Sequence, residues 1–198
     1  MRRPAPRFLY DFNSPYAYLA ASRVDDVLPV PPEWQPIAFA FVLRARGRDP
    51  WSLHPEQRAV GVAECERRAR GYGLAPMRWP PGWPVKSYSL LPLRAALAAE
   101  EEGLLRQFSR AAFARNFVDG GGLGRPEDVA AVAASVGLDG QAVLARAAAE
   151  EIKRRLQEST EAAIALGVTG VPTVELGDQL FWGDDRLSAA AAAAADLG

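Results

Sequence analysis

The stretch Tyr10-Asp11-Phe12-Asn13-Ser14-Pro15-Tyr16-Ala17-Tyr18-Leu19 decides the fold, because it predicts a strand that runs directly into a helix. Apolar and aromatic side chains dominate residues 7–12, which is typical of a buried strand. Pro15 suits the first position of a helix, and Ser14 or Asn13 suits its N-cap. The sequence therefore places a serine hydroxyl at a strand–helix junction, beside the unpaired amides of a first helical turn.

The segments that follow alternate between helix and strand before a long helical region. We expect the first helix over 15–28. Alternating apolar residues over 33–41 predict a second strand, parallel to the first because a helical crossover joins them. A charged helix is expected over 55–71, and the pattern from 89 to 166 is helical almost throughout.

The C-terminal part predicts two short strands and a last helix. Gly167-Val168-Thr169-Gly170-Val171-Pro172-Thr173-Val174 indicates a turn and then a buried strand entered through a proline. A Gly177-Asp178 turn follows, and an acidic segment from Asp184 begins the helix. The order of elements predicts an α/β protein: a thioredoxin-like fold formed by 1–45 and 167–198, split by an all-helical insertion domain over 46–166.

Composition argues against several classes of protein and site. The chain has 23 basic and 24 acidic residues and a formal charge of −1, which argues against a nucleic-acid partner. With one cysteine, Cys65, and one histidine, His54, the chain can form neither an intramolecular disulfide nor a cysteine–histidine zinc site. We expect no metal, no membrane partner and a cytoplasmic location, because no apolar segment predicts a signal peptide or a membrane span.

The N-terminal motif, the Val171-Pro172 motif and Leu180-Phe181-Trp182-Gly183-Asp184-Asp185-Arg186-Leu187 together resemble one family. This family is the glutathione-dependent 2-hydroxychromene-2-carboxylate isomerases, which are relatives of kappa-class glutathione transferases and of DsbA-like proteins. The resemblance implies glutathione as cofactor, a small aromatic keto acid as substrate, and a homodimer. The implied reaction interconverts 2-hydroxychromene-2-carboxylate and trans-o-hydroxybenzylidenepyruvate, or a related intermediate of aromatic degradation, through transient thiolate addition.

The resemblance also assigns site residues. Ser14 is the implied catalytic residue, with a hydroxyl that keeps the glutathione thiol ionised. The backbone of Val171, before a proline that is cis in thioredoxin-like folds, is expected to pair with the cysteinyl unit. The residues implied to bind glutathione are Asn13, Ser14, Val171, Pro172, Asp184 and Asp185.

Each of these residues also has a simpler interpretation. Ser14 can be an N-cap alone, and capping and thiolate donation would then compete for one oxygen. Pro172 can be an ordinary trans proline at the start of a strand. Asp184 and Asp185 suit the first turn of any helix.

An aromatic pocket is expected to hold the substrate. Flat rings suit an aromatic substrate by stacking, although the same rings could simply pin a proline-rich loop. Two cations, Arg48 and Lys86, stand near positions where the family often carries asparagine, and Arg44, Arg48 or Lys86 could bind a substrate carboxylate. The residues expected to line this pocket are Phe41, Arg48, Trp79, Trp83, Lys86 and Tyr88.

Two other functions remain open from the sequence. A kappa-type glutathione transferase would release a conjugate with an electrophile instead of an isomerised product. A non-catalytic thioredoxin-fold module would hold an extended peptide beside Val171 and would be indifferent to Ser14→Ala.

Overall fold

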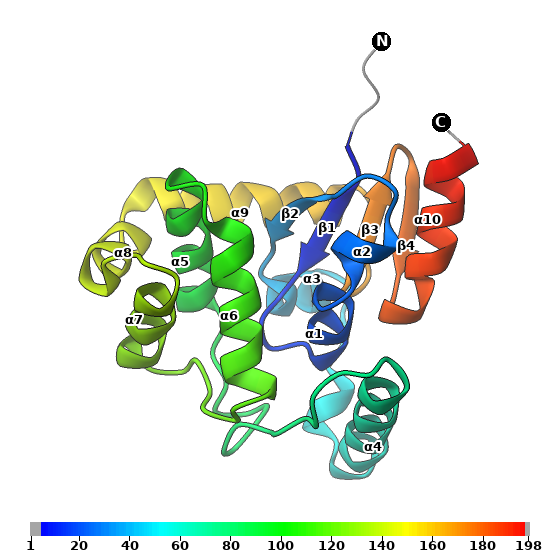
Figure 1. Cartoon of the computed structure of the whole chain (residues 1–198), viewed down its shortest axis with the longest axis horizontal. Coiled ribbons are helices and arrows are strands. Elements are labelled where there is room, and N and C mark those ends of the chain that lie inside the picture. The colour runs from blue at the N-terminus through cyan, green and yellow to red at the C-terminus, as the bar shows by residue number, and fades with distance from the viewer. Residues whose placement is uncertain (1–4, 197–198) are drawn as a thin grey trace.

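A mixed four-stranded sheet lies at the centre of the computed structural model, which describes residues 5–196 (Figure 1). The strands follow the order β2-β1-β3-β4 across the sheet. β1 and β2 are parallel, whereas β3 is antiparallel to both β1 and β4. This topology confirms the thioredoxin-like fold. The strands are β1 (Arg7–Tyr10), β2 (Glu33–Pro36), β3 (Thr173–Leu176) and β4 (Gln179–Trp182).

Helices account for most of the remaining structure, and those between β2 and β3 confirm the helical insertion. None of the helices in the described residues is both long and apolar enough to cross a membrane. The α-helices are α1 (Pro15–Ala21), α2 (Val24–Val27), α3 (Phe39–Ala45), α4 (Pro55–Gly71), α5 (Leu90–Glu101), α6 (Leu105–Phe117), α7 (Pro126–Ser135), α8 (Gly140–Ala147), α9 (Glu150–Ala165) and α10 (Leu187–Asp196). Short 3₁₀ turns occupy Trp51–Leu53 and Asp184–Arg186.

Two predicted elements were wrong in extent. The expected helix over 15–28 is divided into α1 and α2, and Ser22, whose hydroxyl and amide both donate to the Tyr18 carbonyl, caps the end of α1. The expected strand over 33–41 ends at Pro36, and residues 39–45 form α3 instead. The Asp11 carboxylate accepts the Phe39 amide at 2.9 Å, so a buried side chain from the β1–α1 loop marks the start of this helix.

Alternate residues of β1 pack into two different hydrophobic clusters. Phe8 and Tyr10 point toward the face covered by α1 and α6, where Tyr10 lies 5.7 Å from the ring of Phe113. Leu9 points toward the opposite face, where it joins a smaller cluster with residues of α3 and α9 such as Val42. This alternation is the period of two that a strand imposes on its side chains.

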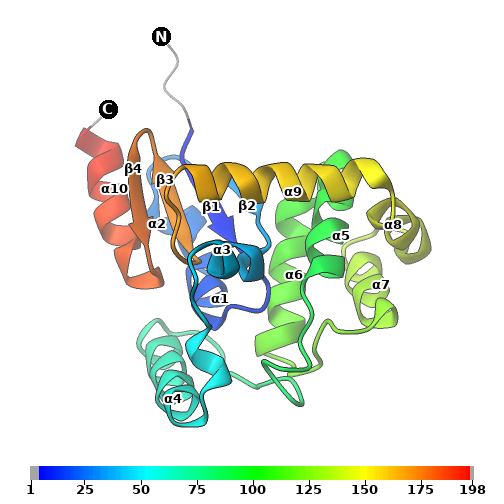
Figure 2. The same cartoon turned by 180° about the vertical axis from the view of Figure 1, so that it is seen from behind.

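The helical region lies mainly beside the sheet. Helices α5 to α8 form a block at one side, while α9 runs from that block along the sheet, and α4 lies below α1 in these views and contacts it (Figures 1 and 2). Aromatic residues of α6 belong to the same buried cluster as those of β1. The part of the chain expected to be an insertion therefore shares one core with the sheet, and the division at 46 and 166 stays a prediction.

Candidate functional site

Ser14 occupies the junction between β1 and α1 as the N-cap of the helix. Its Oγ accepts the Ala17 amide at 3.2 Å and donates to the Val171 carbonyl at 3.3 Å. Capping therefore uses a lone pair of the oxygen and not the hydroxyl hydrogen, so capping does not compete with donation to a thiolate. A thiolate would instead compete with the Val171 carbonyl, which accepts this hydrogen in the structure.

Asp11 fixes the loop that carries Ser14. Its buried carboxylate accepts the amides of Asn13 at 2.8 Å and Phe39 at 2.9 Å and the hydroxyl of Ser89 at 3.1 Å. These three donors come from the β1–α1 loop, α3 and the residue before α5. Burial raises the pKa of Asp11 above its ordinary value, and the three hydrogen bonds oppose that shift. Asp11 is a positioning residue that the sequence analysis missed.

The turn before β3 brings a second backbone group to Ser14. The Val171–Pro172 peptide bond is cis, as the resemblance implies. The Thr173 hydroxyl donates to the Gly170 carbonyl at 2.7 Å. Trp182 packs so closely against Gly170 that a Cβ there would lie 2.1 Å from the indole nitrogen. These contacts hold the Val171 carbonyl toward the Ser14 hydroxyl.

The two aspartates of the acidic turn have different environments. Asp184 is buried and accepts hydrogen bonds from Arg68 at 2.7 Å and from the Tyr72 hydroxyl at 2.9 Å. Burial raises the pKa of Asp184, and its contact with Arg68 counteracts this shift. Asp185 is exposed, and its carboxylate lies 3.4 Å from Arg68. Asp184 thus ties this turn to α4, while Asp185 is the carboxylate that solvent and a ligand can reach.

We expect Asp184→Ala to lower the free energy of unfolding by about 2 kcal/mol, because it leaves Arg68 and Tyr72 without a buried acceptor. The neighbouring Asp185→Ala is the matched control and should change it by less than about 0.5 kcal/mol. Urea unfolding of both variants measures the difference. Equal losses of unfolding free energy in the two variants would contradict the assignment of a structural role to Asp184 and not to Asp185.

A cavity of about 730 Å³ brings many of the expected site residues together. We call it the Ser14 cavity. It is lined by residues from the start of α1, from the turn before β3, from the acidic turn and from 48–57. Five residues named from the sequence as glutathione-binding, and one named for the substrate, lie here: Ser14, Val171, Pro172, Asp184, Asp185 and Arg48.

Asn13 lines a smaller neighbouring hollow of about 140 Å³. Trp83 also lines this hollow, and its indole donates to the Asn13 carbonyl at 3.2 Å. Ser14 and Trp51 line both spaces. The serine therefore joins the cavity that contains five of the expected glutathione-binding residues to the hollow that contains the sixth.

Four residues expected in the substrate pocket lie elsewhere. Phe41 is on the other face of α3, half exposed, because its segment is helical and not a strand. Trp79 donates to Glu66 at 2.9 Å and packs against Trp83 at 4.7 Å, so it pins the proline-rich loop. Tyr88 lines a separate small hollow, and Lys86 is exposed and lines neither space at Ser14.

The walls of the Ser14 cavity include residues that the sequence analysis did not name. Arg48, which it did name, lies over the ring of Trp182 at 5.7 Å. No sequence signal marks the wall residues, because α4 and β4 approach Ser14 only in the folded chain. The unnamed residues include Trp51, Gln57 and Arg68, and two residues that the sequence analysis named without a role in the site, His54 and Trp182, also line this cavity.

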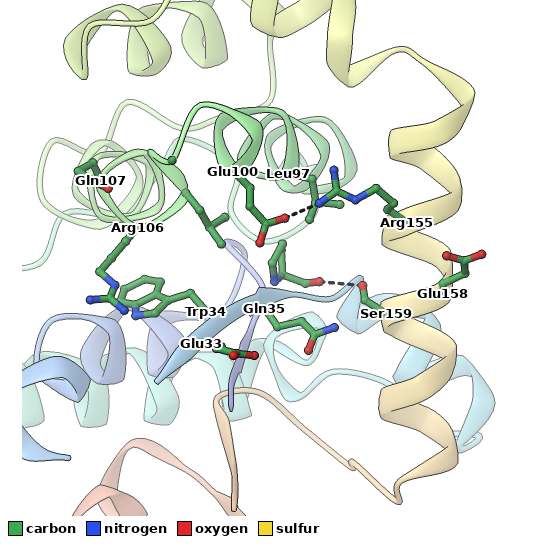
Figure 3. A pocket seen from close by; sticks show the side chains of 13 residues that line it. Glu33, Trp34, Gln35, Leu97, Glu100, Arg106, Gln107, Arg155, Glu158 and Ser159 are labelled. Carbon is green, nitrogen blue, oxygen red and sulfur yellow. Dashed lines mark hydrogen bonds and ion pairs between the residues drawn. The ribbon is translucent and has the colours of Figure 1, made fainter. Parts of the chain in front are cut away.

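Another hollow, of about 760 Å³, lies between β2, the adjoining ends of α5 and α6, and α9 (Figure 3). Its two arginines are already engaged, since Arg155 pairs with Glu100 and Arg106 donates to the Pro32 carbonyl. Ser159 donates to the Pro36 carbonyl. This hollow offers no free nucleophile. Across residues 5–196, no cluster of histidine, cysteine and acidic side chains has the form of a metal site.

Comparison with known proteins identifies similar proteins and the family of the chain. The chain is 28% identical to the 2-hydroxychromene-2-carboxylate isomerase of Sphingobium xenophagum, over 91% of this chain and 92% of that protein. It is 24% identical to Glutathione S-transferase kappa 1 of Homo sapiens, over 93% and 89%. A solved structure of a 2-hydroxychromene-2-carboxylate isomerase superposes with a TM-score of 0.85 at 25% identity, covering 97% and 95%. The model of the DSBA-like thioredoxin domain matches residues 7–195, and the chain therefore belongs to the DSBA-like thioredoxin family.

Proposed function

We propose that this protein is a glutathione-dependent isomerase that acts on 2-hydroxychromene-2-carboxylate or a closely related aromatic keto acid. Two curated relatives carry the name of that isomerase, and each is matched over about nine-tenths of this chain. The proposal also rests on the Ser14 cavity, in which a hydroxyl lies between a backbone carbonyl and aromatic walls.

The observation that carries the proposal is that Ser14 lines the cavity, whereas the chain's one thiol does not. Cys65 is buried in α4, and burial raises the pKa of its thiol to about 12. A thiol with this pKa is a poor nucleophile near neutrality. The reactive sulfur therefore has to enter the cavity on a ligand, and Ser14 is the group placed to meet it.

The energies involved are sufficient to ionise such a sulfur. A free thiol has a pKa near 8.5. One hydrogen bond to a charged group contributes roughly 1.5–3 kcal/mol, and each pKa unit corresponds to 1.36 kcal/mol. Because α1 has seven residues, we assign most of the effect to the Ser14 hydroxyl and little to the helix dipole. A pKa depression of one to two units follows.

The residues of the cavity fit glutathione in distinct ways. The Val171 carbonyl can accept the cysteinyl amide of the tripeptide, and the Ser14 hydroxyl then turns its hydrogen from that carbonyl to the sulfur. The present 3.3 Å bond is long, so little is lost in the exchange. The exposed carboxylate of Asp185 suits the γ-glutamyl ammonium.

When bound, glutathione would supply a sulfur that adds reversibly to the conjugated double bond of the substrate, which permits rotation and then elimination. The protein's part is to hold the hydroxyl hydrogen at Ser14 and to exclude water with the rings of Trp51 and Trp83. Arg48 lines the cavity, and its guanidinium would bind the substrate carboxylate.

Arg48→Ala is expected to raise KM for the keto acid roughly fivefold or more, because it removes a cation from the Ser14 cavity. Lys86→Ala is the matched control: Lys86 is exposed outside both spaces at Ser14, so KM should stay within about twofold of wild type. Steady-state kinetics at saturating glutathione measures both values. If KM is unchanged in Arg48→Ala, this residue does not bind the substrate.

A kappa-type transferase is the second candidate, favoured by the human relative of that name. The two functions share the activated sulfur and differ in the product. Chromatography of the reaction with the keto acid decides between them, since an isomerase regenerates glutathione and a transferase consumes it. Calorimetry with reduced glutathione tests both, because neither survives if the tripeptide does not bind.

A further inference from the structure

We propose that a cavity on the opposite face of α3 binds an aromatic carboxylate, independently of the Ser14 cavity. This space of about 630 Å³ lies between α3, α5 and α9, and we call it the Arg94 cavity. Its size is within the range of small-molecule sites, which is about 300–1,000 Å³. The inference does not depend on the proposed isomerase function.

The first argument is an arginine without a partner. Arg94 of α5 lines the cavity, and its Nε is buried with no hydrogen-bond partner among the described residues. A buried donor that is left unpaired costs free energy, and a carboxylate is the acceptor that matches a guanidinium best. Because the Nε atom itself is buried, a bound carboxylate would contact the rest of this guanidinium, whose side chain lines the cavity.

The second argument is the balance of charge around the cavity. Arg44 and Lys153 also line it, from α3 and α9 respectively. Two carboxylates oppose these three cations. Glu150, outside the lining, pairs with Lys153 at 2.6 Å and is also near enough to Arg94 for an electrostatic interaction, and Glu161 lines the cavity and accepts a bond from Gln157. One positive charge remains in excess, which fits a ligand with a single negative charge.

The third argument is the apolar part of the lining. Phe41 is half exposed at this cavity, and Leu90, Leu156 and Ile164 line it as well. A half-exposed aromatic ring beside aliphatic side chains offers a surface for a flat hydrophobic group. The Thr160 hydroxyl, which also lines the cavity, is already used, because it donates to Leu156 and accepts the Ala38 amide. The cavity therefore suits a ligand with one negative charge and a flat apolar group.

Helix α3 separates this cavity from the Ser14 cavity. Phe39 and Leu43, one helical turn apart, line the Ser14 cavity, whereas Phe41 and Arg44 line the Arg94 cavity. No residue lines both. A variant in one cavity can therefore be compared with a matched variant in the other.

Equilibrium dialysis with 2-naphthoate tests the proposal. Wild type should bind with a submillimolar Kd, and Arg94→Gln should weaken binding at least tenfold, whereas Arg48→Gln and Ser14→Ala should stay within twofold. The neutral analogue 2-naphthalenemethanol should bind at least tenfold more weakly than the acid. Thermal unfolding monitored by circular dichroism checks that Arg94→Gln is folded.

Several results would overturn the proposal. One is an absence of binding at millimolar 2-naphthoate. Others are equal affinity of wild type and Arg94→Gln, or equal affinity of wild type for the acid and the alcohol. A loss of binding confined to Arg48→Gln would place the ligand in the Ser14 cavity. If Arg94→Gln does not fold, the affinities of Phe41→Ala and Arg44→Gln for 2-naphthoate are compared with that of wild type instead. Both residues are exposed, and each variant should weaken binding at least threefold.

Discussion

Ser14→Ala is expected to lower kcat/KM of the glutathione-dependent isomerisation by about 10- to 150-fold. The variant removes the hydroxyl hydrogen that stabilises the ionised sulfur, and one such hydrogen bond contributes roughly 1.5–3 kcal/mol. Loss of the N-cap also lowers the free energy of unfolding by about 1 kcal/mol, which urea unfolding measures separately. The activity is measured at saturating glutathione and at temperatures well below unfolding.

Two variants separate the chemical role of Ser14 from capping. Ser14→Thr keeps both the cap and a hydroxyl, so it should retain much more activity than Ser14→Ala. Ser22→Ala removes the hydroxyl at the other end of α1 and should leave kcat/KM within about twofold. Activity of Ser14→Ala within twofold of wild type would show that Ser14 only caps the helix.

Asp11→Ala is expected to lower the free energy of unfolding by about 4 kcal/mol. The variant leaves the amides of Asn13 and Phe39 buried or half-buried without their acceptor, and each such group costs about 1–3 kcal/mol. It also frees the segment that positions Ser14, so glutathione affinity should fall in parallel. Denaturant unfolding and calorimetry measure the two effects.

Asp139→Ala is the matched control for Asp11→Ala. Asp139 also accepts two backbone amides, at the N-cap of α8, but these bonds are exposed. Its loss should cost only about 1 kcal/mol and leave glutathione affinity unchanged. Equal destabilisation by the two variants would contradict the role assigned to the buried carboxylate.

The pH dependence of stability gives a further check on Asp11. Burial raises its pKa in the folded state, so the folded chain binds the proton more tightly than the unfolded chain does. The contribution of Asp11 to the free energy of unfolding therefore falls as pH rises from the ordinary carboxyl pKa, about 3.9, through the raised folded value. The difference in unfolding free energy between wild type and Asp11→Ala should therefore decrease as pH rises from about 3.9 through the raised folded pKa.

The sequence predicts those parts of the fold that local patterns control. The strand before Ser14, the helix over 55–71 and the hairpin around Gly177-Asp178 are all confirmed. Each depends on side-chain alternation, helix-start residues or turn residues that lie within a few positions of one another. The thioredoxin-like topology follows from their order.

A long-range hydrogen bond accompanies one of the two wrong predictions, the strand expected over 33–41. The alternation over 33–41 predicts a strand, but the Asp11 carboxylate, 28 residues away, binds the Phe39 amide where α3 begins. That contact turns Phe41 away from Ser14. A pattern within the segment carries no information about a buried acceptor from another loop.

The candidate site could also be predicted only in part from local sequence patterns. Ser14, Val171 and the acidic turn can be named from short motifs, and the structure brings them to one cavity. The motif does not reveal that Asp184 is occupied by Arg68 and Tyr72 while Asp185 is exposed, since both partners lie on or next to α4. The walls of the cavity likewise come from segments far apart in the chain.

The most direct test of the central claim is an ultraviolet thiolate titration of glutathione bound to wild type. We expect the bound thiol to titrate one to two pKa units below the free value near 8.5, and this shift should be largely lost in Ser14→Ala. A bound thiol that titrates at its free value in wild type would contradict the account, because Ser14 would then not stabilise the ionised sulfur.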